Sequence, residues 1–286
     1  MPELLKSHKK DLGGFFVTRV LPNINHQMIG PFIFFDHMGP AKFSAGKGID
    51  VRPHPHIGIA TITYLFEGSI LHRDSLGFEQ EIKPGDINLM TAGSGIVHSE
   101  RETQAVRNSI HHLDGLQLWF ALPDSLQEIN PAFDHYPKNE LPVFEHNGAT
   151  VFLMSGELFS KKSPVKTYSP MFYADVKLPH SCSIETPSES QETGIYVING
   201  EIIIGTESYQ ALDFIFIAQG EMTEITAQSD AQLILIGGEP FQTKRYIWWN
   251  FVSNSKERID QAKSDWKNGS FGKVPGDDEY IPLPDK

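Results

Sequence analysis

The chain has 286 residues, of which 40% are hydrophobic and 21% are charged, so it can bury one large core or two ordinary ones. Its formal net charge of −12 argues against direct nucleic-acid binding, because proteins that neutralise phosphates usually carry a basic patch. With 24 glycines and 19 prolines, the composition is that of a turn-rich globular protein.

Two further features bear on the compartment. No apolar run approaches the ~20 residues that span a bilayer, and residues 1–12 are polar, without the apolar core of a signal peptide. Cys182 is the single cysteine, so no disulfide can form within the chain. We therefore expect a cytoplasmic protein with no membrane segment, and we expect it to be a monomer.

In chain order, the first informative element is a predicted strand that carries two histidines. His54 and His56 alternate with prolines, and side chains at i and i+2 of a strand point to the same face. The 12 histidines of this chain would give about 0.5 such pairs by chance, so the pair alone is a weak motif. Its value depends on the segment that follows.

That segment alternates predicted strands with turns and ends at a second motif. Residues 59–66 and 70–73 are predicted strands, and Lys83–Asp86, with Pro-Gly at its centre, is typical of a type II turn. Residues 87–91 form the next strand, and a glycine-rich turn then leads to His98-Ser-Glu100. This order brings the two ends of the segment together across a small barrel.

The two motifs together offer three imidazoles and one carboxylate, from His54, His56, His98 and Glu100. Nitrogen and oxygen donors in this mixture suit a borderline divalent ion such as Fe(II), Mn(II), Ni(II), Cu(II) or Zn(II), whereas calcium and magnesium prefer oxygen. Without thiolates the set also lacks the closed sulfur shell of a structural zinc. The sequence therefore predicts a metal site with an open coordination position.

Other histidines of the first half have less specific interpretations. His72 and Asp74 lie in the predicted hairpin, where an exposed position is favoured over a place beside the metal. His111 and His112 are neighbours, so in a strand they point to opposite faces and cannot both join one site.

An internal repeat predicts the architecture. Residues 63–70 are echoed by residues 195–202, and residues 84–93 are echoed by residues 211–220. Two copies predict two jelly rolls in one all-β chain. The second copy has no histidine at the corresponding places, so the chemistry is predicted to lie in the first half.

The repeat also sets the predicted domains. We expect an N-terminal barrel with the metal site over residues 1–133, a linker over 134–147, and a second barrel with a helix and an extended arm over 148–286. The helix is predicted over residues 254–267, where Asn254 and Glu257 resemble a capping box. An apolar stripe at helical spacing predicts that it packs on the second barrel; the stripe consists of Ile259, Ala262 and Trp266.

Several of these segments together resemble the pirin family of the cupin superfamily. They are R-P-H-P-H at 52–56, T-Y-L-F-E-G at 63–68, P-G-D at 84–86 and M-T-A-G-S-G-I-V-H-S-E at 90–100, with further likeness at 31–37 and 115–119. Many cupins take a glutamate ligand four residues after the second histidine, where this chain has Ala60. Pirin-like proteins are similar to this chain in placing the acid at Glu100. The resemblance covers nearly the whole chain and implies a bicupin with a short C-terminal helix.

The resemblance also implies a function. Several pirin-like proteins are associated with quercetin 2,3-dioxygenase activity, which would make this chain a metal-dependent enzyme that opens a flavonol or similar enol-bearing ring with O2. Fe(II) is the expected ion, and Glu100 is the candidate catalytic base as well as a ligand.

An alternative comes from the animal member that names the family. It is associated with an iron-dependent, redox-responsive role as a transcriptional co-regulator, acting through protein contacts. The acidic charge of this chain is compatible with a protein partner. Under this hypothesis the metal site is a sensor and catalyses no reaction.

Overall fold

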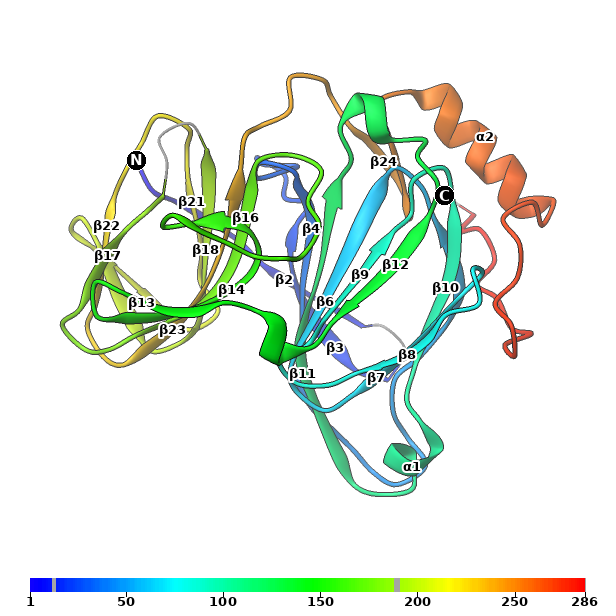
Figure 1. Cartoon of the computed structure of the whole chain (residues 1–286), viewed down its shortest axis with the longest axis horizontal. Helices are drawn as coiled ribbons and strands as arrows, with labels where there is room; N and C mark the ends of the chain where they lie inside the picture. Colours follow the sequence, from blue (N-terminus) through cyan, green and yellow to red (C-terminus); the bar gives the residue numbers. More distant parts are fainter. Residues whose placement is uncertain (12–13, 188–190, 286) are drawn as a thin grey trace. The chain divides into compact units, whose positions relative to one another are not determined.

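The computed structural model describes residues 1–11, 14–187 and 191–285 and confirms the prediction of an all-β chain (Figure 1). Its described part contains two α-helices, the single turn α1 (Gln104–Arg107) and the longer α2 (Lys256–Lys267). Neither helix has the length and apolar character that crossing a lipid bilayer requires.

The chain forms two compact units, and each includes a terminal segment from the far end of the sequence. We call residues 9–18, 35–138 and 242–286 the N-terminal barrel, and residues 1–8, 19–34 and 139–241 the C-terminal barrel. The sequence predicts residues 242–286 as part of the second barrel, but they fold with the first. The boundaries at 133 and 148 stay a prediction.

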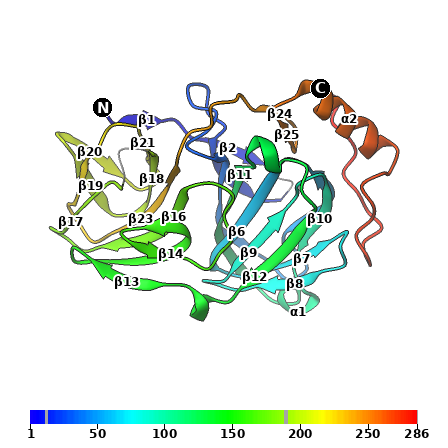
Figure 2. The same ribbon diagram turned by 45° about the horizontal axis from the view of Figure 1, so that its top comes forward.

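Two sheets contain the strands of the N-terminal barrel (Figure 2), and β2, β3 and β4 of the larger sheet also include residues 8, 19–21 and 32–34 of the other unit. The smaller sheet has the order β5 (Asp50–His56), β10 (Ile96–Arg101), β7 (Ile70–Asp74), β8 (Glu79–Ile82). The larger sheet has the order β12 (Ala132–Tyr136), β9 (Ile87–Thr91), β6 (Ile59–Glu67), β11 (His111–Ala121), β4 (Phe32–Phe43), β3 (Phe16–Leu21), β2 (His8–Asp11). A hairpin of β24 (Tyr246–Trp248) and β25 (Phe251–Ser253) follows late in the chain.

The C-terminal barrel also has two sheets, around a core of aliphatic and aromatic side chains. The larger has the order β1 (Glu3–Leu5), β21 (Phe214–Ile217), β18 (Glu192–Asn199), β23 (Ala231–Gly238), β16 (Met171–Leu178), β14 (Ala149–Leu158), β13 (Val143–His146), with β15 (Lys161–Lys162) paired to β14. The smaller has the order β17 (Ser183–Glu185), β22 (Glu224–Ala227), β19 (Glu201–Ile204), β20 (Glu207–Gln210).

The predicted repeat corresponds to the same strand pairing in both barrels. Tyr64 of β6 lies opposite Ile87 of β9, and the aligned Tyr196 of β18 lies opposite Phe214 of β21. The turns that enter β9 and β21 also match. In the first, Gly85 N–H donates to the carbonyl of Leu65 over 3.0 Å; in the second, Leu212 N–H donates to the carbonyl of Val197 over 2.8 Å.

The turn before β9 has the geometry that its sequence predicts. The Asp86 N–H donates to the carbonyl of Lys83 over 3.0 Å, and Gly85 has φ +89°, the positive value that a type II turn needs after proline. In the second barrel Leu212 adopts φ +74° at the aligned position. The backbone shape is therefore kept although glycine is not.

Helix α2 differs from its prediction in two ways. Ser255, and not Asn254, is the N-cap, because the Ser255 hydroxyl accepts the N–H of Arg258 over 3.2 Å. The apolar stripe packs on the N-terminal barrel, where Ile259 and Ala262 form one buried cluster with Ile57 and Phe251. The predicted packing on the second barrel is therefore wrong, since spacing along a helix shows which face is apolar but not which surface that face covers.

Gly58 makes the tight connection between β5 and β6. It has φ +68°, and a Cβ there would lie 2.0 Å from the carbonyl oxygen of Val252. We expect Gly58→Ala to lower the free energy of unfolding by roughly 3 kcal/mol or more, because steric overlap adds to backbone strain.

Gly269→Ala is the matched control. Gly269 has φ +70° in the same compact unit, and a Cβ there would meet no heavy atom within 4 Å. It should therefore show the backbone strain alone, about 1 kcal/mol. Denaturant titration of both metal-free variants measures the difference, and equal losses would show that the approach of Val252 is unimportant.

Candidate metal centre

The register of two antiparallel strands brings the predicted histidines together. His54 of β5 lies directly opposite His98 of β10, and His56 lies opposite Ile96. Because directly opposed residues and residues two apart share one face of a sheet, all three imidazoles point the same way. The pairing of β5 with β10 thus brings together two short motifs that lie about forty residues apart in the sequence.

The prolines between the histidines are compatible with this strand because of its place in the sheet. β5 is the edge strand of its sheet and pairs there only with β10. Proline lacks an N–H and is tolerated at an edge. One extra residue lies on β5 between the pairs His54–His98 and Val51–Glu100, which makes a β-bulge below the histidines.

The three imidazoles are close enough to share one ion. One nitrogen from each of His54, His56 and His98 lies within 4.8 Å of the others, and each side chain is buried, at 6%, 1% and 2% exposure. Within the described parts of the chain this is the one group of three or more metal-binding side chains with such spacing.

Burial keeps these rings neutral. It lowers the pKa of His54 to about 4 and holds the pKa values of His56 and His98 well below 6.5, with mutual repulsion among the rings acting in the same direction. A neutral imidazole carries the nitrogen lone pair that a metal needs. The site is therefore ready to bind a cation near neutral pH.

The hydrogen bonds of the rings fit metal binding. His54 Nδ1 donates to the carbonyl of Arg52 over 2.9 Å, which leaves Nε2 with its lone pair. His98 Nε2 is buried and has no hydrogen-bond partner among the described residues. A buried, unpartnered acceptor is costly in a folded protein, and a bound divalent ion would account for it.

Glu100 lies on the same strand but is not part of the close group. It is two residues beyond His98 on β10 and opposite His72 of β7. Its carboxylate is outside the set of ligand atoms within 4.8 Å of one another. Burial raises the pKa of Glu100 to about 7, because it disfavours the ionised carboxylate. A positive charge nearby would stabilise that ionised form.

His72 and Asp74 are the residues that the sequence misplaces. Both are buried, at 5% and 0% exposure, and His72 Nδ1 lies 3.4 Å from His98 Nδ1. The alternation of β7 carried a signal, since both share a face with the buried Ile70. The pairing of β7 with β10, which puts that face against His98, has no such signal in the sequence.

Aromatic rings of the facing sheet cover the cluster. Trp119 of β11 sets its ring at 81° to His56, with centroids 4.9 Å apart, and Phe133 of β12 stacks on His72 at 4.3 Å. β11 and β12 belong to the larger sheet of the N-terminal barrel. The histidines therefore lie between the two sheets, inside this barrel.

Comparisons with known proteins agree with this geometry. Residues 14–120 match the family model Pirin, and residues 173–272 match the model of the pirin C-terminal cupin domain. A pirin-like protein of Caulobacter vibrioides is 48% identical over 285 residues, which cover 98% of each chain. The chain belongs to the pirin family.

Two further relatives of this pirin chain carry the name of an activity. The "Putative quercetin 2,3-dioxygenase PA1205" of Pseudomonas aeruginosa is 38% identical over 266 residues, covering 92% of this chain and 82% of that protein. The crystal structure of quercetin 2,3-dioxygenase from Acinetobacter baumannii is 34% identical, with a TM-score of 0.89, and covers 100% of this chain and 96% of that one. The predicted bicupin fold is confirmed.

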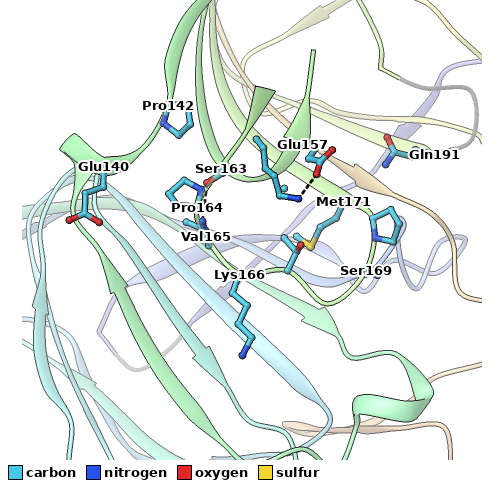
Figure 3. Close-up of a pocket in the computed structure, with 14 residues that line it drawn as sticks. Glu140, Pro142, Glu157, Ser163, Pro164, Val165, Lys166, Ser169, Met171 and Gln191 are labelled. Carbon is cyan, nitrogen blue, oxygen red and sulfur yellow. Dashed lines mark hydrogen bonds and ion pairs between the residues drawn. The ribbon is translucent and has the colours of Figure 1, made fainter. Parts of the chain in front are cut away.

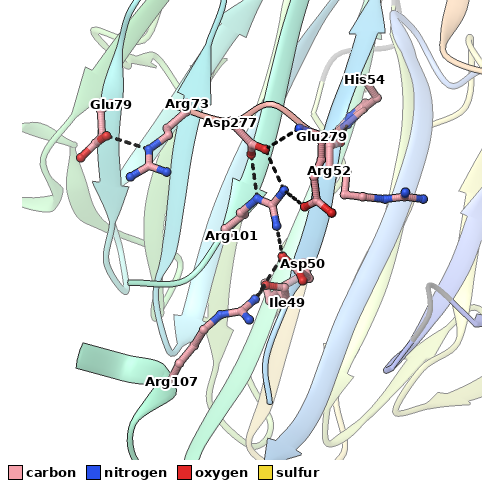
Figure 4. Close-up of polar contacts among 10 residues, drawn as sticks. All are labelled: Ile49, Asp50, Arg52, His54, Arg73, Glu79, Arg101, Arg107, Asp277 and Glu279. Carbon is pink, nitrogen blue, oxygen red and sulfur yellow. Dashed lines mark hydrogen bonds and ion pairs between the residues drawn. The ribbon is translucent and has the colours of Figure 1, made fainter. Parts of the chain in front are cut away.

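The C-terminal arm of this pirin, which contains Asp277 and Glu279, contacts the outer face of β10. Arg101 of β10 donates to both oxygens of Asp277, from Nε over 2.7 Å and from Nη2 over 2.9 Å (Figure 4). Its guanidinium also contacts Glu279 and Asp50. Because Arg101 directly follows Glu100, these contacts fix the end of β10 from outside.

We expect the ion pair of Arg101 and Asp277 to make stability depend on pH. Burial raises the pKa of Asp277, but the hydrogen bonds from Arg101 outweigh this effect and hold it below the ordinary 3.8. Asp277→Asn should therefore cost about 2 kcal/mol at pH 7. Because a lowered pKa stabilises the fold only while the group is ionised, the difference from wild type should shrink as pH falls below 3.8.

Denaturant titration of the metal-free protein at several pH values measures this difference. Asp278→Asn is the control, because Asp278 is the exposed neighbour of Asp277 and loses the same charge. A difference between wild type and Asp277→Asn that stayed constant down to pH 3 would contradict the role of the ion pair.

A cavity of about 950 Å³ lies in the C-terminal barrel of this pirin, and Figure 3 shows its lining. Lys162 and Glu157 belong to this lining, and Lys162 Nζ donates to Glu157 Oε1 over 2.6 Å. The described residues that line it include no histidine or cysteine. Its described lining therefore offers no imidazole cluster like the candidate metal site of the N-terminal barrel.

Proposed function

We propose that this pirin is a metal-dependent dioxygenase that opens a flavonol or related enol-bearing ring with O2. The observation that carries the proposal is the convergence of three buried, neutral imidazoles inside the N-terminal barrel. The relatives with quercetin 2,3-dioxygenase names support the substrate class.

The proposed ligands are the close group His54, His56 and His98, with Glu100, whose carboxylate lies outside that group, as the fourth. Three nitrogens and one carboxylate oxygen suit Fe(II) first, with Mn(II), Ni(II), Cu(II) or Zn(II) as other ions of the same class. A bound redox-active ion would make the enol hydroxyl of a substrate more acidic and let electron density pass from the substrate to O2. The four protein groups leave coordination positions open, which that chemistry needs.

Glu100 is the proposed base. Its place beyond His98 on the same face of β10 lets its carboxylate accept the proton of the substrate hydroxyl. The aromatic ring of Trp119 against His56 excludes water from one side of the cluster. In this proposal both atoms of O2 enter the ring-cleaved product.

We expect His98→Ala and His56→Ala to lose stoichiometric metal and quercetin-dependent oxygen uptake together while keeping the fold. The measurement is metal content and steady-state oxygen consumption after anaerobic reconstitution with Fe(II), Mn(II), Ni(II) or Cu(II). His112→Ala is the control, because its side chain is 47% exposed and lies away from the cluster. Full metal content in His98→Ala would contradict the ligand assignment.

The same experiment decides between the two classes of function. Oxygen uptake with a ring-cleaved product, dependent on both metal and His98, would support the dioxygenase and name its working ion. Stoichiometric metal in the wild type without any turnover of quercetin would contradict it. That result would favour the redox sensor that acts through a protein partner.

Glu100→Gln separates a base from a ligand. If Glu100 takes the substrate proton, the variant should lose at least about 100-fold in kcat while its metal affinity falls much less, because the amide oxygen can still face the ion. Metal titration beside oxygen consumption measures both quantities. Losses of equal size would make Glu100 a ligand only.

A further inference from the structure

We propose that Asp74 and His72 form a hydrogen-bonded relay that fixes the tautomer of His98 and leaves the Nε2 lone pair of His98 for the metal. The relay deepens the proposed metal site and rests on it. Asp74 and His72 would act as positioning residues, since neither belongs to the close group of ligand atoms.

The relay begins at a rigid carboxylate. Asp74 ends β7, is fully buried, and its Oδ1 accepts the N–H groups of Leu76 over 2.9 Å and Phe78 over 3.2 Å. The Asp74 N–H in turn donates to the carbonyl of Phe78 over 3.1 Å. The hairpin between β7 and β8 therefore holds one carboxylate oxygen in place and leaves the other for a side chain.

That other oxygen orients His72. Asp74 Oδ2 lies 2.9 Å from His72 Nε2. In the proposed relay Asp74 is a carboxylate, which only accepts, so Nε2 of a neutral His72 carries the proton and its Nδ1 is an acceptor. Phe133 stacks on His72 with an interplanar angle of 15° and keeps the ring in this plane.

The acceptor on His72 determines the state of His98. The two Nδ1 atoms are 3.4 Å apart, and one of them must donate. Because His72 Nδ1 accepts, His98 Nδ1 carries the proton and His98 Nε2 has the lone pair. This agrees with the buried His98 Nε2, which lacks a partner among the described residues.

The strand register keeps the three groups together. Asp74 lies opposite His98, and His72 lies opposite Glu100, across the pair β7 and β10. His54 has its Nδ1 fixed in another way, by the main-chain carbonyl of Arg52. His54 thus keeps its Nε2 lone pair because a main-chain carbonyl accepts its Nδ1–H, and His98 keeps its own because His72 accepts its Nδ1–H.

Asp74→Asn reverses the order of these hydrogen bonds. The amide oxygen can keep the N–H groups of Leu76 and Phe78, which leaves the NH2 group facing His72 Nε2. That nitrogen must then accept, so His72 Nδ1 donates to His98 Nδ1 and the proton of His98 moves to Nε2. We expect the variant to bind Co(II) about 10- to 100-fold more weakly than wild type.

Two measurements test the proposal. Long-range ¹⁵N–¹H spectra of the metal-free protein should show His98 as the Nδ1–H tautomer in wild type and as the Nε2–H tautomer in Asp74→Asn. Titration with Co(II) alone should then show the loss of affinity. Asp86→Asn is the matched control, because its carboxylate also accepts two main-chain N–H groups, those of Lys83 and Lys138.

A second variant covers a failure of Asp74→Asn to fold, which thermal melting would report. His72→Phe keeps a ring against Phe133 but has no acceptor for the His98 Nδ1–H group. His98 should then no longer be held in the Nδ1–H tautomer, and Co(II) binding should weaken. An unchanged His98 tautomer or an unchanged Co(II) affinity in the folded variant overturns the relay. A wild type that shows the Nδ1–H tautomer but binds no Co(II) contradicts the proposed metal site and leaves the hydrogen-bond order intact.

Discussion

The antiparallel register of β5 and β10 is the constraint on which the candidate metal centre depends. It sets His54 opposite His98 and carries His56 along on the same face. Because side chains alternate along a strand with a period of two, a slip of one residue would turn one strand's histidines away from the other's. The site therefore relies on the features that fix this register: the bulge on β5, the tight connection at Gly58 and the outer contacts of Arg101.

The same scaffold occurs twice, but only one copy carries the cluster within the described residues. The matched pairs Tyr64–Ile87 and Tyr196–Phe214 show that the barrel is specified by strand pairing and turns, independently of the ligands. Gly85 of the first barrel aligns with Leu212 of the second, and both have a positive φ, so the turn residue differs while the backbone path is kept. The candidate metal cluster thus lies in one of two barrels that share this strand pairing.

The sequence predicts most of this fold and the three histidines from strand periodicity, turn residues, the internal repeat and the family resemblance. It fails where the outcome depends on which element packs against which. His72 and Asp74 alternate with the partly buried Leu71 and Arg73, and only the pairing of β7 with β10 shows that the face of His72 and Asp74 is the inner one. Helix α2 is predicted at the right place from its local residue pattern, whereas the surface that it covers is not. The tie between Arg101 and Asp277, 176 residues apart in sequence, has no local signal at all.

The fully buried Asp74 and the partly buried Glu100 lie beside the histidines, and their surroundings suit the two carboxyl groups to different tasks. Asp74 is held by the main chain and by His72, so its charge is already satisfied and its position is fixed. Glu100 has its pKa raised by burial alone, so its charged form is poorly stabilised by the protein. A cation or a substrate proton would relieve that cost at Glu100 and would change little at Asp74. Glu100, whose charge the protein stabilises poorly, is therefore suited to bind a cation or to accept a substrate proton. Asp74, which is already hydrogen-bonded, is suited to hold the His72 ring in place.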